Sequence, residues 1–408
     1  MTTHLLHPVG LKAQAVNFQA LPPLSLYIHV PWCVRKCPYC DFNSHEAKNG
    51  LPEQEYVAAL VRDLELALPQ IWGRKVYTVF IGGGTPSLLS AQAVEKILAA
   101  VRMLLPLDVN AEITLEANPG TVEAERFAGY RDAGVNRLSL GIQSFNDMHL
   151  KALGRVHDAA EAKRAIQIAQ QHFDNINLDL MYGLPQQTLA QAEQDVYTAL
   201  EFLPPHLSCY HLTLEPNTQF HRYPPVLPDD DASHAMQQGI EELLAARGYQ
   251  HYETSAFAQP KKQSRHNLNY WQFGDYLGIG AGAHSKLSFP DKVVRQARHK
   301  QPQAYLDAMA QDVPVQGEHE LGCDDLAFEF MMNALRLNQG FAATLFTERT
   351  SMSLQVLRRE MEQAEQRRLL TRNHQRIAPT ELGQRFLNDL LEIFLRGQGS
   401  KEKQGSTD

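Results

Sequence analysis

The residues best suited to chemistry in this sequence are three cysteines that lie within eight positions of one another. Cys33, Cys37 and Cys40 follow the spacing C-x₃-C-x₂-C, whereas Cys209 and Cys323 are isolated. Cysteine thiolates bind soft metals and iron–sulfur clusters. Because one loop provides three thiols and no obvious fourth ligand, the spacing predicts a [4Fe–4S] cluster with three irons bound to the protein and one iron open.

A zinc site is the main alternative, because His29 and His45 lie nearby and could complete a ligand set. Structural zinc sites usually have paired C-x₂-C knuckles or histidines at set distances. Incidental core cysteines are a second alternative, but such cysteines rarely cluster between two prolines such as Pro31 and Pro38. The spacing favours the iron–sulfur cluster over both.

The composition indicates a globular protein of roughly two or three domains. The chain has 408 residues, of which 44% are hydrophobic and 21% charged, and its net charge is -8. This charge argues against a surface that binds phosphates, so no nucleic-acid partner is expected. Five cysteines in this arrangement are no disulfide framework, which favours a cytoplasmic protein. No apolar run approaches the ~20 residues of a transmembrane segment, and no secretory signal is expected.

Short apolar runs alternate with longer amphipathic stretches over the first half of the chain. The runs have the length of strands and the stretches have helical periodicity, which predicts βα units and an α/β fold with a partial (βα)6-type barrel. The predicted strands are residues 24–30, 76–84, 112–120, 137–145, 176–185 and 207–216, and the clearest helices are 53–68, 91–105 and 159–172.

Polar and glycine residues follow almost every predicted strand. In parallel α/β sheets, ligands bind at the carboxyl ends of the strands. One mouth of the barrel should therefore collect the three cysteines, the segment GGGTP at 82–86, and Glu116, Asn118, Gln143 and Asp179. GGGTP is no phosphate-binding loop, because no G-x₄-G-K-[ST] pattern follows, but its glycines let the backbone approach a ligand closely.

The strand–helix rhythm changes near residue 300. Residues 326–341 and 353–370 predict helices, and a small hairpin and a closing helix follow, which is typical of a helical or winged-helix module. We therefore expect an N-terminal extension over 1–22, a barrel over 23–298, a C-terminal domain over 299–396 and a disordered tail over 397–408. The C-terminal domain is expected to cap the barrel rather than to bind DNA, because the chain is acidic.

The cysteine spacing, together with GGGTP and the acidic residue at the third strand, resembles the radical S-adenosylmethionine (SAM) superfamily. In that superfamily the amino and carboxylate groups of SAM chelate the open iron. The reduced cluster then splits the sulfonium and yields a 5′-deoxyadenosyl radical. The resemblance implies that the fourth thiol is absent because this iron must stay open.

The stretch YIHVPWC matches the Y-x-H-x-P-x-C of a narrower group, the oxygen-independent coproporphyrinogen III oxidase family. This resemblance covers residues from about 24 to 386. It implies that Cys33, Cys37 and Cys40 bind the cluster. It also implies SAM contacts, some of which serve a second SAM in the oxidase, for Tyr27, Tyr39, Gly83, Gly84, Thr85, Glu116, Gln143, Arg155 and Asp179.

Phe42 departs from the oxidase pattern. The oxidase has C-x₃-C-x₂-C-x-C, and Phe42 stands where its fourth cysteine would be. This departure resembles the heme-chaperone branch of the family, HemW, whose H-N-x-x-Y-W signature fits residues 266–271. The resemblance implies heme contacts for His266, Asn267, Tyr270 and Trp271.

A histidine and two aromatic residues suit heme on chemical grounds as well. A neutral imidazole is a good axial ligand for heme iron, so His266 is the hypothetical ligand. Tyr270 and Trp271 offer flat apolar surface with polar edges. The alternative is a core histidine that bonds to a backbone carbonyl beside aromatic neighbours. The segment GIGAGAHS at 278–285 lacks the G-x-G-x-x-G order, so we expect a tight turn near the barrel mouth and a structural role for His284.

Two functions from different classes follow from these patterns. The first is a heme chaperone, which takes heme as cargo, passes it to an unknown acceptor protein and needs an electron donor for its cluster. The second is an enzyme that decarboxylates coproporphyrinogen III by radical chemistry, and a radical SAM enzyme with another substrate stays open. Phe42 and the H-N-x-x-Y-W segment favour the chaperone, and no residue is assigned a catalytic role.

Overall fold

A single large sheet organises the chain in the computed structural model, which describes residues 16–47, 50–120 and 124–395. The sheet has twelve strands in the order β14-β13-β12-β11-β1-β4-β5-β6-β7-β8-β10-β9. Seven adjacent strands are parallel, and all six predicted strands are among them. In sheet order the seven are β11 (Asp275–Ile279), β1 (Leu24–Val30), β4 (Val76–Gly83), β5 (Leu107–Ala117), β6 (Arg137–Gln143), β7 (Ile176–Tyr182) and β8 (His206–His211).

Antiparallel strands extend the sheet at both edges. One edge carries β10 (Ala256–Ala258) and β9 (Gln250–Glu253), and the other carries β12 (His284–Ser288), β13 (Val293–Arg298) and β14 (Val315–Glu320). The order begins at β14 and ends at β9, so the sheet stays open. This confirms the predicted partial barrel.

Strand β1 shows how the sequence builds the two faces of the sheet. Leu26 and Ile28 are fully buried and pack with helix α1 in the main core. The intervening Ser25, Tyr27 and His29 point to the other face, because successive side chains of a strand alternate. The outer face is therefore apolar, and the inner face carries polar groups that can form a site.

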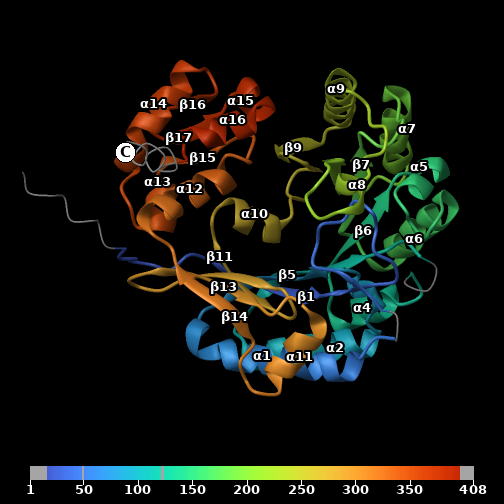
Figure 1. Ribbon diagram of the computed structural model, residues 1–408, viewed down its shortest axis with the longest axis horizontal. Coiled ribbons are helices and arrows are strands. Elements are labelled where there is room, and N and C mark those ends of the chain that lie inside the picture. The colour runs from blue at the N-terminus through green and yellow to red at the C-terminus, as the bar shows by residue number, and fades with distance from the viewer. Residues whose placement is uncertain (1–15, 48–49, 121–123, 396–408) are drawn as a thin grey trace, which may run out of the picture.

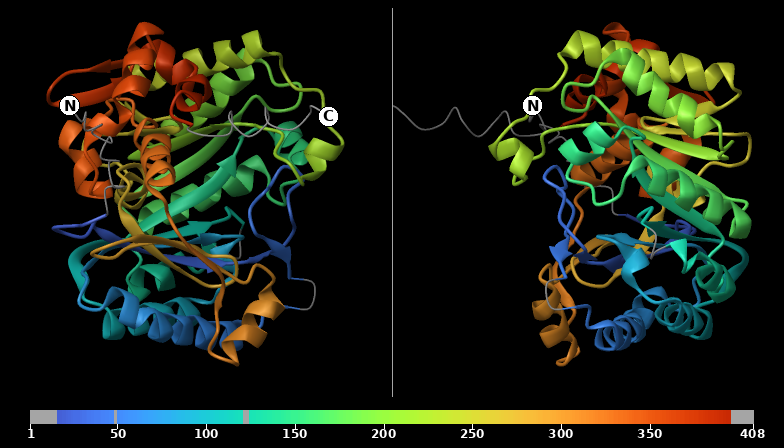
Figure 2. Two further views of the ribbon diagram at one scale, coloured as in Figure 1. Left: turned by 60° about the vertical axis from the view of Figure 1, so that its left-hand side comes forward. Right: turned by 90° about the vertical axis from the view of Figure 1, so that its right-hand side faces the viewer.

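Helices cover the outer face of the sheet. Figures 1 and 2 show α1, α2 and α11 lying side by side along one side of it. Helix α6 begins with a capping box formed by Asp158 and Glu161, which satisfies two backbone amides of its first turn. The helices of this layer are α1 (Glu53–Ile71), α2 (Ala91–Leu104), α4 (Phe127–Ala133), α6 (Ala159–His172), α7 (Leu189–Leu200), α9 (Asp230–Ala246) and α11 (Pro302–Met309), and the short α5 (Asp147–Ala152) follows the end of β6.

Shorter elements connect these layers. They are β2 (Trp32–Cys33) and β3 (His45–Glu46) in the cysteine loop, η1 (Pro86–Leu88) after GGGTP, α8 (Gln219–Arg222) and α10 (Arg265–Trp271). The segment 278–285 forms the predicted turn between β11 and β12, with Gly280 and Gly282 at positive φ.

The C-terminal part of the chain forms a second core, visible at the upper left of Figure 1. Helices are followed by a hairpin, as predicted, and the one closing helix that was expected is divided into two short helices. These elements are α12 (Cys323–Ala334), β15 (Phe341–Ala342), α13 (Ala343–Thr350), η2 (Leu354–Leu357), α14 (Arg358–Gln366), β16 (Leu370–Arg372), β17 (Arg376–Pro379), α15 (Glu381–Arg385) and α16 (Leu387–Glu392).

The predicted domain boundary at 298/299 stays a prediction. Helix α11 contacts α1, and β14 pairs with β13, so residues 302–320 lie against the large sheet. Residues 1–15 of the predicted extension and the predicted tail at 397–408 lie outside the described residues. No helix in the described ranges is both long and apolar enough to cross a membrane.

Candidate functional site

The cysteine loop between β1 and α1 is held in shape by hydrogen bonds of the protein itself. Lys36 Nζ donates to the carbonyl oxygens of Phe42 and Ser44, both at 3.2 Å. Asn43 Nδ2 donates to the carbonyl oxygens of Ala281 at 3.1 Å and Lys300 at 2.9 Å. The loop is thereby tied to the β11–β12 turn on one side and closed on itself on the other.

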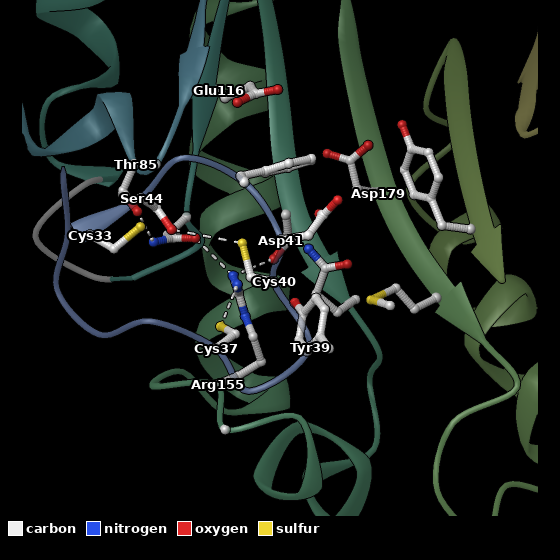
Figure 3. Close-up of a pocket in the computed structure, with 18 of the residues that line it drawn as sticks. Cys33, Cys37, Tyr39, Cys40, Asp41, Ser44, Thr85, Glu116, Arg155 and Asp179 are labelled. Carbon is white, nitrogen blue, oxygen red and sulfur yellow. Dashed lines mark hydrogen bonds between the residues drawn. The ribbon is translucent and has the colours of Figure 1, made fainter. Parts of the chain in front are cut away.

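The three cysteines of this loop line one cavity of about 340 Å³, which we call the thiol cavity. Arg155 Nη1 lies 3.7 Å from Cys37 Sγ, and Ser44 Oγ lies 3.9 Å from Cys40 Sγ. Figure 3 shows the cysteines and Arg155 at one end of the cavity, with Glu116 and Asp179 toward the other.

The donor set fits a cluster better than a single metal ion. Among the described residues no three His, Cys, Asp or Glu side chains are grouped so that they could hold one metal ion. A zinc site needs its ligands around one point, whereas an iron–sulfur cluster needs thiolates spread around a larger group. Cys33, Cys37 and Cys40 around an open cavity therefore fit a [4Fe–4S] cluster, and the zinc alternative loses support.

The segment GGGTP brings backbone to the wall of the thiol cavity. Gly83 has φ +116°, and a Cβ there would lie 2.6 Å from the ring of His29. A Cβ at Gly84 would lie 2.5 Å from the carbonyl oxygen of Trp32. Both positions therefore require glycine. The amide of Gly83 donates to Glu116 Oε2 at 3.1 Å, which fixes this carboxyl at the strand end.

Two acidic side chains share the inner end of the cavity. Burial and the charge of Asp179 raise the pKa of Glu116 to about 8. Burial also raises the pKa of Asp179, although Asn177 Nδ2 at 2.8 Å and Ser139 Oγ at 3.1 Å donate to its carboxylate. Perturbed pKa values of this kind cluster at functional sites.

Gln143 and Arg155 complete the cavity wall between β5 and β7. Gln143 has φ +68° at the end of β6, a strained conformation that clusters at functional sites. Arg155 Nη2 donates to Asn118 Oδ1 at 2.8 Å and to the carbonyl oxygen of Gly141 at 2.9 Å. Arg155 Nε is buried without a hydrogen-bond partner, so the guanidinium retains a donor.

The structure brings nearly all the residues predicted to bind SAM into the thiol cavity. The exception is Tyr27, which lines an adjacent cavity of about 580 Å³ that we call the tyrosine cavity. The hydroxyl oxygen of Tyr27 lies 3.0 Å from His29 Nδ1. The two cavities share one wall, formed by Asp41, Phe42, Ser44, Gly83 and Glu116.

Further residues line the thiol cavity that were not predicted as site residues, and Ser139, Met181 and Tyr210 are among them. Ser139 and Met181 lie four and two positions from Gln143 and Asp179 on the same strands, so period-two alternation could have indicated them. Tyr210 lies opposite Met181 in the register of β7 and β8, which the sequence alone does not define.

The H-N-x-x-Y-W segment forms helix α10 behind the tyrosine cavity. His266 is 1% exposed, its Nδ1 lies 2.8 Å from Thr78 Oγ1, and its Nε2 has no hydrogen-bond partner. Burial and the charge of Arg137 lower the pKa of His266 to about 3, so the imidazole is neutral. Its ring lies 5.0 Å from the rings of both Phe80 and Tyr270.

The other members of this segment have separate surroundings. Tyr270 lines the tyrosine cavity, whereas His266, Asn267 and Trp271 line neither of the two cavities. The Trp271 ring is covered by the guanidinium of Arg336 at 4.3 Å. The backbone amide of Asn267 donates a hydrogen bond of 3.3 Å to Oγ of Ser264, the N-cap residue of α10. The roles of all four residues in heme binding stay predictions.

Comparisons with known proteins agree with this geometry. Residues 27–196 match the radical SAM superfamily, and residues 323–386 match the HemN C-terminal domain. Heme chaperone HemW of Escherichia coli K12 is 50% identical over 377 residues, which cover 92% of this chain and 99% of that protein. The chain belongs to the HemW family. The Haemophilus influenzae HemW is 49% identical over 381 residues, covering 92% of this chain and 98% of that protein.

A solved structure extends the fold comparison beyond HemW. Coproporphyrinogen III oxidase (HemN) of Escherichia coli, a radical SAM enzyme, superposes with a TM-score of 0.78 at 23% identity, over 92% of this chain and 90% of that one. This chain and HemN thus share one fold over nearly their whole length. Membership of the radical SAM superfamily implies a [4Fe–4S] cluster and SAM, and the three cysteines that would bind the cluster line the thiol cavity.

Proposed function

We propose that this protein is a heme chaperone of the cytoplasm, which binds heme and passes it to an acceptor protein. The observation that carries the proposal is the match of almost the whole chain to proteins named heme chaperone HemW. Phe42 supports it, because this exposed residue replaces the fourth cysteine of the oxidase motif.

The thiol cavity would hold the cluster and SAM in this function. Cys33, Cys37 and Cys40 would bind three irons. When bound, the reduced cluster supplies the electron for cleavage of the SAM sulfonium, and an electron-donor protein would have to reduce it. The backbone at Gly83 and Gly84 would lie against the methionine part of SAM.

The acidic residues would position SAM by charge. SAM carries a sulfonium and an ammonium group, and Glu116 and Asp179 lie across the cavity from the cysteines. Deprotonation of Glu116 becomes easier when a positive charge replaces solvent next to it. Tyr39 and Arg155, which line the same cavity, would orient the remaining polar groups, and Thr85 and Gln143 would close the wall.

Anaerobic reconstitution tests the proposal. The protein with its cluster restored is titrated with heme in the presence and absence of SAM, and the Soret band is followed. Heme-loaded protein is then mixed with apomyoglobin as a reporter acceptor. We expect stoichiometric heme binding and transfer to the reporter at a rate that SAM changes.

The oxidase is the second candidate, because the cluster cysteines and the SAM cradle are all present. The same reconstituted protein is therefore incubated with coproporphyrinogen III, SAM and dithionite. Formation of vinyl-bearing product at many turnovers would replace the chaperone with the oxidase. Absence of both heme binding and product would overturn both candidates.

A further inference from the structure

The tyrosine cavity has an exposed imidazole at its edge, His284. His284 is the first residue of β12 and directly follows the turn that contains Gly280 and Gly282. A Cβ on Gly282 would lie 2.1 Å from Asn43 Nδ2, so the turn packs tightly against the cysteine loop. The backbone that carries His284 is therefore fixed, while its side chain faces the cavity.

The other imidazoles of this cavity are already engaged. Both ring nitrogens of His29 are occupied, by the Tyr27 hydroxyl at 3.0 Å and by the Asn43 carbonyl oxygen at 2.9 Å. His45 Nε2 lies 3.3 Å from Asn43 Oδ1. Within the described part of the chain no hydrogen bond to the ring of His284 occurs. It is the imidazole that a ligand can reach without breaking a contact.

Aromatic side chains line the same cavity as His284. Tyr270 and Tyr276 lie with ring centroids 4.4 Å apart, and Tyr27 lines the cavity beside them. Phe42, with 60% of its surface exposed, lies on the wall shared with the thiol cavity. Flat apolar surface of this kind suits a macrocycle, and a cavity of about 580 Å³ is in the usual range for ligand pockets.

Cationic side chains lie near the same imidazole, although Asp41 and Glu116 also line the cavity. Lys36 and Lys300 line the cavity, and the charges of Lys300 and Arg295 both act on His284. Lys36 is engaged with the carbonyl oxygens of its own loop, whereas the exposed side chain of Lys300 can reach an anion. Such a cation can pair with one of the two propionates of heme.

We propose that heme is captured in the tyrosine cavity, with His284 as an axial ligand of its iron and Lys300 beside a propionate. This inference rests on the proposed function and assigns its cargo site. His266 would need helix α10 to move before its Nε2 could meet iron, because its ring is enclosed between Phe80 and Tyr270. His284 needs no such movement.

Heme titration of variants of the full-length, cluster-loaded protein tests the assignment. His284→Ala should weaken heme binding about tenfold or more, equivalent to about 1.4 kcal/mol, and remove the Soret shift of the bound form. His284→Tyr should retain heme with the changed spectrum of a phenolate ligand. Metal-free protoporphyrin IX separates the two contacts: its affinity should be unchanged in His284→Ala and lowered in Lys300→Glu.

One histidine serves as the control, and His266 tests the alternative axial ligand. His374 is exposed between β16 and β17, outside both cavities, so His374→Ala should bind heme as the unmodified protein does. His266→Ala should retain the Soret shift. Loss of the shift in His266→Ala together with its retention in His284→Ala would overturn the assignment. Failure of the unmodified protein to bind heme would instead refute the proposed function.

Discussion

At the scale of single residues, the three motif cysteines differ from the two isolated ones in their surroundings. Cys33, Cys37 and Cys40 line the thiol cavity, whereas Cys209 is buried in the core and Cys323 begins helix α12. We expect substitution of any motif cysteine by Ala to abolish the brown iron–sulfur absorbance after reconstitution, because only two protein ligands would remain to hold the cluster.

Iron content and the absorbance spectrum measure this effect. Cys209→Ala and Cys323→Ala are the matched controls, and both should retain full iron and colour. A motif variant with unchanged absorbance would contradict the assignment of that cysteine.

The carboxyl of Glu116 predicts a pH dependence of the free energy of unfolding. Its pKa in the folded protein is about 8, above the value in the unfolded chain, so between about pH 4.5 and 8 the folded state holds a proton that the unfolded state has lost. This group therefore stabilises the fold at low pH and loses that effect as the pH rises to 8.

Glu116→Gln removes the titration. We compare the free energy of unfolding of this variant with that of the unmodified protein, both without SAM, by urea denaturation at pH 5 and at pH 8. The difference between them should shift by about 1–3 kcal/mol in favour of the variant from pH 5 to pH 8, because only the unmodified protein loses stability through this titration. An equal stability difference at both pH values would show that Glu116 does not titrate in this range.

At the scale of elements, the turn after β4 depends on glycine. Gly83→Ala places a methyl group against the buried His29 ring at a φ that disfavours any side chain. We expect the variant to lose about 1–3 kcal/mol of stability and to bind SAM more weakly, as measured by denaturation and by calorimetry of the reconstituted protein.

Gly317→Ala is the control for this prediction. Gly317 lies in β14 with nothing within 4 Å of a Cβ and no positive φ, so its substitution should change neither quantity. SAM affinity in Gly83→Ala equal to that of the control would exclude a role for this turn in binding.

Elements were predicted well because their signals are local. The parallel strands are apolar runs buried by helices, and capping residues such as Asp158 mark helix starts. The predicted site residues share strand ends, and the fold brings those ends together. The place of Tyr210 in the cavity could not be predicted without the register between β7 and β8. The separation of Tyr27 from the thiol cavity could not be predicted without the path of the cysteine loop. The exposure of His284 depends on a turn whose packing no local pattern encodes.

At the scale of the whole molecule, the second core joins the C-terminal helices to the large sheet. Phe330 of α12 is fully buried, and its ring lies edge-on to that of Phe273, with the ring centroids 5.7 Å apart. Phe273 lies two residues after the end of α10. Phe330 also contacts Phe341 and Phe346. Phe330→Ala should therefore lower the free energy of unfolding by about 3–5 kcal/mol.

Thermal and chemical denaturation measure this change. Phe386→Ala is the control, because this side chain is 52% exposed and should cost little. A loss in Phe330→Ala no larger than in the control would mean that the two parts of the chain are held together elsewhere.

The wall between the two cavities has a thermodynamic consequence. Phe42, Gly83 and Glu116 line both cavities, so if SAM occupies one and heme the other, both ligands would contact the same residues. Equilibrium linkage would then be reciprocal: the factor by which bound SAM changes the affinity for heme equals the factor by which bound heme changes the affinity for SAM. One coupling free energy would therefore describe how each ligand changes the affinity for the other.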